Sequence, residues 1–246
     1  MELSREKQYK RWRQRLAWVQ HYLKAKLNGK EKDRVLLLTK QIKNQDGAVI
    51  FDVGAHFGYL AKEFCKLLGG RAKVYCFEPV EYTRSVLLRV MKPFANAIVE
   101  DFALSDKNGY VDISIPIKES GNLGIGLSHF GAESARDYII EKIRTVRLDD
   151  YVMDKGIERL DLIKCDVEGA EFLVFKGGAA TIDQFRPVVY SEICEQHTRR
   201  LGYAAQEIFD FFFAKNYKSY VMDKAGGLVE VKGTIQGAED YLFVPN

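Results

Sequence analysis

Acidic side chains recur where short apolar runs end in this sequence of 246 residues. Asp52, Glu78, Asp101, Asp166 and Glu192 each follow a stretch rich in β-branched or aromatic residues, which is the composition of a buried strand. The carboxyl ends of parallel strands meet at one edge of a sheet, and ligands bind at that edge. The pattern therefore predicts one polar site to which these five carboxylates contribute.

The first of these runs leads into a glycine-containing turn, Phe-Asp-Val-Gly-Ala-His-Phe-Gly, from Phe51 to Gly58. Gly54 permits a tight turn and a close approach of ligand to backbone, and Gly58 allows the next helix to pack closely. The spacing lacks the three glycines of dinucleotide-binding loops, so it suits a ligand without a phosphate, such as S-adenosylmethionine (SAM). Asp52 would serve the methionine end of that cofactor, directly or through water, while His56 shapes the loop.

Two later carboxylates fit the adenosine part of such a cofactor. Glu78 lies 24 residues after Gly54, near the distance at which an acidic residue binds the ribose hydroxyls. Asp101 ends the third strand and could accept from the exocyclic amine of adenine, a role for which the adjacent Glu100 competes. The predicted cofactor-binding residues are Asp52, Gly54, His56, Gly58, Glu78 and Asp101.

A second acidic cluster occupies 161–171, with Asp166 at the centre of the expected edge and Glu168 directly after it. Methyl transfer to a hydroxyl requires removal of the hydroxyl proton by a carboxylate base or with help from a metal. Glu192 ends the next strand and would converge on Asp166, and His197 is a further candidate base. The predicted catalytic residues are Asp166, Glu168 and Glu192. Two alternatives stay open, a Mg2+ ion held by Asp166 and Glu192, and acidic capping of a helix N-terminus.

Strand-like and helical runs alternate from Ala48 onward. We expect strands at 48–53, 73–77, 97–102, 110–115, 145–148, 160–165, 187–193, 217–222, 228–231 and 241–244, and helices at 59–68, 81–91, 134–142, 171–175 and 205–216. Alternation of this kind indicates an α/β fold, a mostly parallel sheet with helices on both faces. The C-terminal strands suggest an antiparallel edge, and the glycine-rich stretch Ser120–Gly131 is expected to be a loop that closes over the substrate.

The first 46 residues form a basic N-terminal arm. They hold thirteen Lys or Arg and five Asp or Glu, a net charge of +8, which leaves −5 for the remainder of a chain whose total is +3. Apolar residues recur at helical spacing, at Tyr9, Trp12, Leu16, Val19, Leu23 and Leu27. The helix either docks on the domain with a solvated basic face, or serves as a lid or recognition helix for an anionic substrate, nucleic acid or acidic lipid surface. We therefore predict a helical arm, 1–46, and one domain, 47–246.

Taken in order, the motifs resemble those of the FkbM-type methyltransferases. The likeness covers about residues 48–245 and is carried by the motifs at 51–58, 77–79, 103–106, 147–150 and 163–171, by Glu192 and by the closing 241–245. It implies a class I (Rossmann-like) methyltransferase fold with a seven-stranded sheet, and SAM-dependent O-methylation of a hydroxyl on a sugar or secondary metabolite. The family usually has Asn where this sequence has His56.

Other function classes fit the sequence less well. An NAD-dependent oxidoreductase would need the missing third glycine, and a non-catalytic binding module that partners through the arm need not keep the acidic strand ends. The four cysteines show no ligand spacing, so we expect reduced thiols in a cytoplasmic protein, and no apolar run reaches bilayer length. The expected partner is a small-molecule hydroxyl acceptor, whose identity the sequence leaves open together with a homo-oligomeric state.

Overall fold

The computed structural model describes residues 5–116, 129–130, 138–223, 227–237 and 239–246. Its centre is an eight-stranded sheet in the order β3-β2-β1-β8-β9-β12-β10-β11. The strands are β1 (Val49–Val53), β2 (Lys73–Phe77), β3 (Ala97–Glu100), β8 (Leu162–Cys165), β9 (Val188–Glu192), β10 (Tyr217–Met222), β11 (Leu228–Val231) and β12 (Asp240–Pro245).

The sheet confirms the predicted class I α/β fold, with one correction. Neighbouring strands from β3 to β9 run parallel, and β12 lies antiparallel between β9 and β10. The expected number of seven strands was wrong, because β11 pairs antiparallel with β10 and adds an eighth strand at the edge. The strand order reverses between β1 and β8, which is the place where folds of this class bind ligands.

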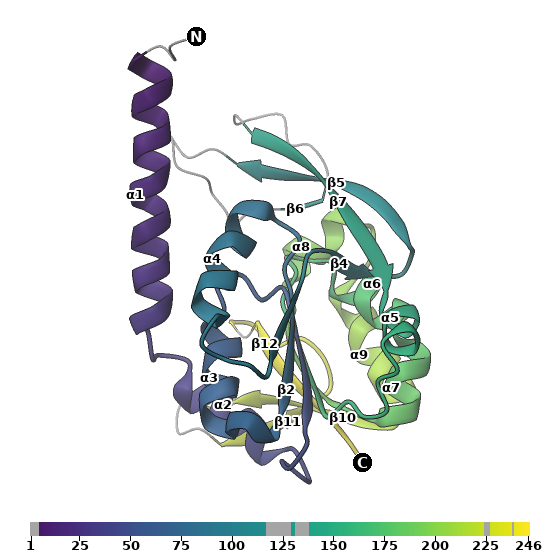
Figure 1. The fold of residues 1–246 in the computed structure, drawn as a ribbon. Helices are drawn as coiled ribbons and strands as arrows, with labels where there is room; N and C mark the ends of the chain where they lie inside the picture. Colours follow the sequence, from purple (N-terminus) through teal and green to yellow (C-terminus); the bar gives the residue numbers. More distant parts are fainter. Residues whose placement is uncertain (1–4, 117–128, 131–137, 224–226, 238) are drawn as a thin grey trace.

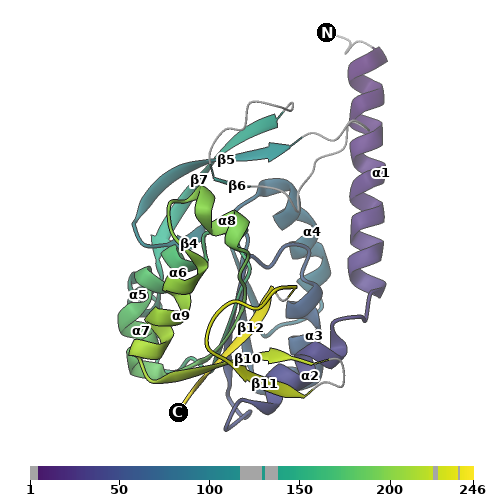
Figure 2. The same cartoon turned by 180° about the vertical axis from the view of Figure 1, so that it is seen from behind.

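Helices cover both faces of the sheet (Figures 1 and 2). On one face lie α1 (Arg5–Leu27), α2 (Lys32–Lys40), α3 (Tyr59–Leu68) and α4 (Glu81–Met91); the other side carries α5 (Leu148–Asp154), α6 (Glu171–Gly177), α7 (Ala179–Phe185), α8 (Glu195–Arg200) and α9 (Ala205–Ala214). Each face has its own core, with Phe64 and Leu87 buried on the α3 face and Phe175, Phe209 and Phe212 on the other. A 3-10 turn, Gly69–Arg71, follows α3.

A second, four-stranded sheet stands beside the carboxyl edge of the first, in the order β4-β7-β5-β6 (Figure 1). Its strands are β4 (Ala103–Ser105), β5 (Gly109–Pro116), β6 (His129–Phe130) and β7 (Tyr138–Arg147). The helix expected at 134–142 was wrong over its described part, because β7 pairs with β5 along the whole length of β5 and its β-branched residues favour a strand. Apart from β6, the loop expected at Ser120–Gly131 lies outside the described residues.

The N-terminal arm packs on the domain through the C-terminal half of α1. The Trp18 Nε1–H donates to Ser85 Oγ at 2.8 Å, and the His21 ring stacks on Phe57 with 4.8 Å between centroids. Ala25 is fully buried in the core of the α3 face. The apolar spacing therefore predicted the wrong docking face, since the described members of that stripe, Leu16, Val19, Leu23 and Leu27, are exposed. The rings of Trp18 and His21 dock the helix instead, through a donated hydrogen bond and through stacking.

Lys62 of α3 joins the domain to the end of α1. Its side chain is buried, and its ammonium donates to the carbonyl oxygens of Ala25, Lys26 and Asn28, at 2.6, 3.3 and 2.5 Å. These carbonyls belong to the last turn of a helix, where no further turn supplies N–H donors. The arm and the domain are thus joined by hydrogen bonds as well as by a common hydrophobic core. The domain boundary between residues 46 and 47 stays a prediction.

None of the described helices combines the length and the apolar character needed to cross a bilayer.

Candidate active site

A cavity of about 380 Å³ opens at the carboxyl edge of the large sheet. Following the sheet order, it is lined by Asp166 after β8, Gly54 after β1 and Glu78 after β2, and then by the second sheet through Leu104 and Ile143. One end of the cavity is therefore charged, the other is apolar, and a carboxylate lies between them. The sheet topology alone produces this order, because each strand delivers one loop to the same edge.

Gly54 is required by a close backbone approach. Its φ is +72°, and a Cβ atom at this position would lie 1.9 Å from the carbonyl oxygen of Asp166. The loop after β1 is therefore in contact with the loop after β8, and any side chain would separate them. Gly58 has a φ of +80° and a Cβ there would lie 2.7 Å from Leu87 Cδ1, so this glycine serves packing against α4 rather than a ligand.

Asp52 does not line the cavity but lies beneath its loop. The side chain is 1% exposed, and Lys164 Nζ lies 3.3 Å from Asp52 Oδ1. Burial raises the pKa of Asp52, and Lys164 opposes that rise. Lys164 also donates to the carbonyl oxygen of Gly54 at 2.7 Å, lies 3.6 Å from Asp166 Oδ2 and lines the cavity. Asp52 thus fixes the position of the Lys164 ammonium, which contacts both the loop after β1 and the loop after β8.

Glu78 and His56 meet at the middle of the cavity wall. Glu78 accepts the backbone N–H groups of His56 and Val80 at 2.9 and 3.0 Å. Burial raises the pKa of Glu78 to about 7, against the lowering effect of these two hydrogen bonds. His56 has a φ of +50°, and burial with the nearby charge of Lys164 lowers its pKa to about 4. The imidazole is therefore neutral near pH 7, in a left-handed backbone region where His, like Asn and Asp, is enriched among residues other than glycine.

The structure brings together the three predicted catalytic carboxylates. Glu192 shares a hydrogen bond with Asp166, and burial together with the charge of Asp166 raises the pKa of Glu192 to about 8. Burial and Asp166 likewise raise the pKa of Glu168 to about 7. His197 Nδ1 lies 3.4 Å from Glu168 Oε2. The pKa values of Glu168 and Glu192 therefore lie near neutral pH, which is what a general base for a hydroxyl requires.

The fourth acidic residue of this segment has a structural task. Glu171 is buried and accepts the backbone N–H groups of Val167 and Gly169 at 2.9 and 3.1 Å. It closes the turn that carries Glu168. Within the described residues, no three His, Cys, Asp or Glu side chains come together as metal ligands would, so the geometry gives the Mg2+ alternative no support.

The acidic residues at the end of the third strand, Glu100 and Asp101, do not reach the cavity. Asp101 is exposed in the bend after β3 and is not among the lining residues of the cavity. Glu100 accepts from Tyr151 Oη at 2.9 Å and pairs with Lys155 Nζ at 3.0 Å. Both acidic residues thus lie away from the cavity, because the chain turns after β3 into the second sheet. The expected contact of Asp101 with adenine finds no support in this geometry.

Sequence reasoning missed three lining residues. Lys164 could have been found from the sequence, because it is the cation in an otherwise apolar strand that is expected to be buried. Thr83 is fully buried and its Oγ1 has no hydrogen-bond partner among the described residues, but a threonine inside a helix gives no signal. Arg34 of α2 was assigned to an arm outside the domain, although it lines the cavity.

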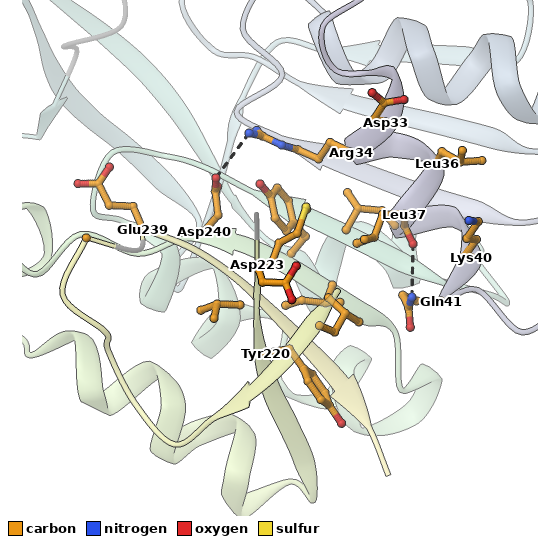
Figure 3. Close-up of a pocket in the computed structure, with 17 residues that line it drawn as sticks. Asp33, Arg34, Leu36, Leu37, Lys40, Gln41, Tyr220, Asp223, Glu239 and Asp240 are labelled. Atoms are coloured by element: carbon orange, nitrogen blue, oxygen red, sulfur yellow. Dashed lines mark hydrogen bonds and ion pairs between the residues drawn. The ribbon is translucent and has the colours of Figure 1, made fainter. Parts of the chain in front are cut away.

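Arg34 also lines a second cavity, of about 680 Å³, between α2 and the C-terminal strands. Figure 3 shows Arg34 and Asp240 pointing toward one another, and their ion pair measures 3.6 Å. The Arg34 guanidinium also pairs with Glu31 at 3.3 Å and lies 5.7 Å from the centroid of the Tyr190 ring. Since Asp240 pairs with Glu192 in the sheet, Arg34 stands between the carboxylate cluster and the second cavity.

Comparison with known proteins identifies the family. The family model described as the methyltransferase FkbM domain matches residues 52–219. The 2-O-methyltransferase NoeI of Sinorhizobium fredii (strain NBRC 101917 / NGR234) is 30% identical over 158 residues, which cover 60% of this chain and 64% of that protein. Methyltransferase FkbM from Methylobacillus flagellatus KT has the same fold, with a TM-score of 0.52 and 14% identity over 80% of this chain and 44% of that one. The match to residues 52–219 spans well over half of the sequence, and the chain therefore belongs to the FkbM methyltransferase domain family.

Proposed function

We propose that this protein is a SAM-dependent O-methyltransferase that acts on a hydroxyl group of a small molecule, a sugar or a secondary metabolite. The observation that carries the proposal is the order of groups along the cavity, from the carboxylates of Asp166 and Glu168 through Glu78 to the apolar second sheet; Glu192 lies behind Asp166 and does not line the cavity. This order matches an acceptor hydroxyl, a ribose and an adenine. Family membership and the name of the 30%-identical relative, a 2-O-methyltransferase, point the same way.

The residues present fit this cofactor. Glu78 would accept the ribose hydroxyls through oxygens that keep free lone pairs beside the two backbone donors, and Thr83 Oγ1 is a buried polar atom with no described partner. Gly54 and His56 would shape the wall next to the ribose, and Asp52 would act through Lys164. Bound SAM would supply an electrophilic methyl group on a sulfonium.

The carboxylate cluster would deprotonate and orient the acceptor. Glu192 lies beside Asp166, which helps to raise the pKa of Glu192 to about 8, so the ionised Glu192 carboxylate would take up a hydroxyl proton near neutral pH. Glu168 adds a third carboxylate, with His197 3.4 Å away from it. The acceptor proton would pass to a carboxylate of this cluster as the oxygen bonds to the methyl group and the methyl–sulfur bond breaks, which would leave a neutral ether and a neutral thioether, S-adenosylhomocysteine. Positioning of the two reactants supplies much of the rate enhancement.

The remainder of the acceptor has room beside this cluster. A ligand of nucleoside size would largely fill the first cavity, about 380 Å³, whereas the second cavity adds about 680 Å³ on the other side of Arg34. We place the part of the acceptor that is not methylated there, where Arg34, Asp223 and Glu239 offer charged hydrogen-bonding groups. A hydroxyl-rich molecule suits such a wall.

The test combines binding and turnover. Calorimetry should show binding of SAM or S-adenosylhomocysteine and none of NAD, and incubation with methyl-labelled SAM and an extract of the source cells should give a labelled product with a methyl ether. Binding of NAD instead of SAM would sink the proposal in favour of an oxidoreductase. Binding of SAM with no labelled product from any extract would favour a non-catalytic binding module.

A cytoplasmic location is proposed on the basis of cysteine usage. All four cysteines are free thiols, and Cys65, Cys76 and Cys165 are buried. Burial raises the pKa of each of these three thiols, which keeps them unreactive. Such thiols suit a reducing compartment.

A further inference from the structure

The outward face of α1 carries an apolar stripe that the domain leaves uncovered. Leu16, Val19 and Leu23 are 44%, 45% and 46% exposed, and Leu27 is 77% exposed. We call these four residues the outer stripe. At about 100° per residue they share one side of the helix, opposite the side that carries Trp18 and the buried Ala25. Figures 1 and 2 both show α1 standing beside α4 and reaching past the body of the domain.

Exposed cations border this stripe on both sides. Arg15 and Lys26 lie on one side of the stripe and Lys24 lies on the other, and all three side chains are exposed. The helix as a whole holds eight Lys or Arg and one acidic residue, a net charge of +7, so the rest of a chain with total charge +3 carries −4. Three of these cations therefore border the outer stripe, while the remainder of the molecule is mildly acidic.

The combination of exposed apolar side chains and flanking cations favours one kind of binding partner over two others. Packing against α1 of a second copy would bring two helices of charge +7 together, and like charges at close range repel. A nucleic acid would satisfy the cations but leave the leucines in contact with water. A bilayer surface with anionic headgroups takes up both, because apolar side chains enter the acyl boundary while Lys and Arg extend to the phosphates and carboxylates.

We propose that α1 is an interfacial helix that binds an anionic phospholipid surface, with the outer stripe among the acyl chains and Arg15, Lys24 and Lys26 at the headgroups. The helix then lies along the surface, and the domain stays attached through Trp18, His21 and Lys62. This inference is independent of the proposed chemistry, since neither the outer stripe nor its flanking cations line either cavity.

Co-sedimentation with vesicles tests the proposal on the full-length protein. The chain should bind vesicles of phosphatidylcholine that contain about 30% phosphatidylserine, bind pure phosphatidylcholine roughly tenfold more weakly, and dissociate as NaCl rises from about 0.1 to about 0.5 M. Leu16→Ser/Leu23→Ser should lower the partition coefficient by roughly tenfold or more. The matched control is Leu88→Ser/Met153→Ser, which removes exposed apolar side chains from α4 and α5 and should leave binding unchanged.

Three results would overturn the proposal: no binding to the anionic vesicles, equal binding by the stripe variant, or an equal loss in the control. A dimer in sedimentation velocity that the stripe variant abolishes, without vesicle binding, would assign the stripe to a second copy. Retention of RNA without vesicle binding would assign the helix to nucleic acid. Thermal unfolding of every variant checks the fold, and because all four substituted side chains are exposed the melting temperature should hold.

Discussion

Lys164 Nζ lies 3.3 Å from Asp52 Oδ1, and both side chains are almost fully buried, at 4% and 1% exposed. Removal of one partner would leave the other charge buried and uncompensated, which costs about 3–5 kcal/mol in proteins. Lys164→Met should therefore lower the free energy of unfolding at pH 8 by about that amount, as measured by urea denaturation. The double variant Asp52→Asn/Lys164→Met should recover a large part of the loss. If its cost equals the sum of the two single costs, the two side chains are not coupled.

The same variant has a defined pH dependence. Without Lys164 the pKa of Asp52, already raised by burial, rises further, so the folded protein keeps a proton that the unfolded chain releases above its ordinary pKa. A raised carboxyl pKa in the folded state means that stability falls as the pH rises. The difference between Lys164→Met and the parent should thus narrow from pH 8 toward pH 5.

Gly54→Ala should be far more damaging than a glycine substitution elsewhere. The new Cβ would lie 1.9 Å from the Asp166 carbonyl oxygen at a φ of +72°, so the loops after β1 and β8 must move apart. Gly156 is the matched control, because its φ is +59° but nothing lies within 4 Å of a Cβ there. Gly156→Ala should cost about 1 kcal/mol from backbone strain alone, and Gly54→Ala at least about 3 kcal/mol. Equal costs in urea unfolding would show that the loop contact is unimportant.

Glu78→Gln should weaken SAM binding without unfolding the protein. Glutamine keeps one acceptor oxygen, so one of the two backbone N–H bonds is retained and the other is lost. It also loses the charge that strengthens hydrogen bonds to the ribose, a loss of about 1.5–3 kcal/mol or roughly 10- to 100-fold in Kd. The pKa of Glu78 is raised to about 7, so affinity of the parent should increase from pH 6 to pH 8 as the carboxyl ionises, and Glu78→Gln should lose this dependence. Calorimetry checks both the affinity and its pH dependence, with Glu81→Gln, at an exposed position, as control. If Glu78→Gln binds SAM with unchanged affinity, Glu78 does not bind the ribose.

The carboxylate cluster should make the protein less stable as the pH rises. The pKa of Glu192 is raised to about 8, so its folded form holds a proton above the ordinary pKa, and that contribution is lost between about pH 4.5 and pH 8. Glu192→Gln should therefore melt at a higher temperature than the parent at pH 8.5, with little difference at pH 5. For Glu195 the pH dependence of stability has the opposite sign, because the hydrogen bond from the backbone N–H of Ala205 lowers its pKa. Glu195→Gln should melt at a lower temperature at pH 7, and parallel pH profiles in the two variants would contradict the electrostatic origin.

The strand ends of the large sheet were predictable because their signals are local. The strand at 73–77 and the helices at 59–68 and 81–91 were predicted with the bounds that the structure has, since apolar runs end there at glycine, proline or acidic residues. Parallel topology then brings Asp166, Glu168 and Glu192 together without further information. These three carboxylates group in space because β8 and β9, the strands that they follow or end, are neighbours in the sheet.

The remainder depends on partners that lie far away in the sequence. The first half of β7 was predicted as part of a helix and only its end as a strand, because hydrogen bonds to β5, a distant strand, decide its conformation. The docked face of α1 is decided by Trp18, whose contact Ser85 lies 67 residues later. Arg34 reaches the active-site cavity only because α2 packs against the domain, and no spacing in the arm announces that packing.

The contact of Lys62 with the end of α1 has an evolutionary consequence. Three carbonyl oxygens of the arm accept from this ammonium, so a relative with a shorter or differently placed first helix would have to find another partner for the cation or lose it. Position 62 is therefore expected to covary with the length and ending of the preceding helix. The arm can be exchanged among relatives only together with a change in α3, the helix that follows the loop after β1.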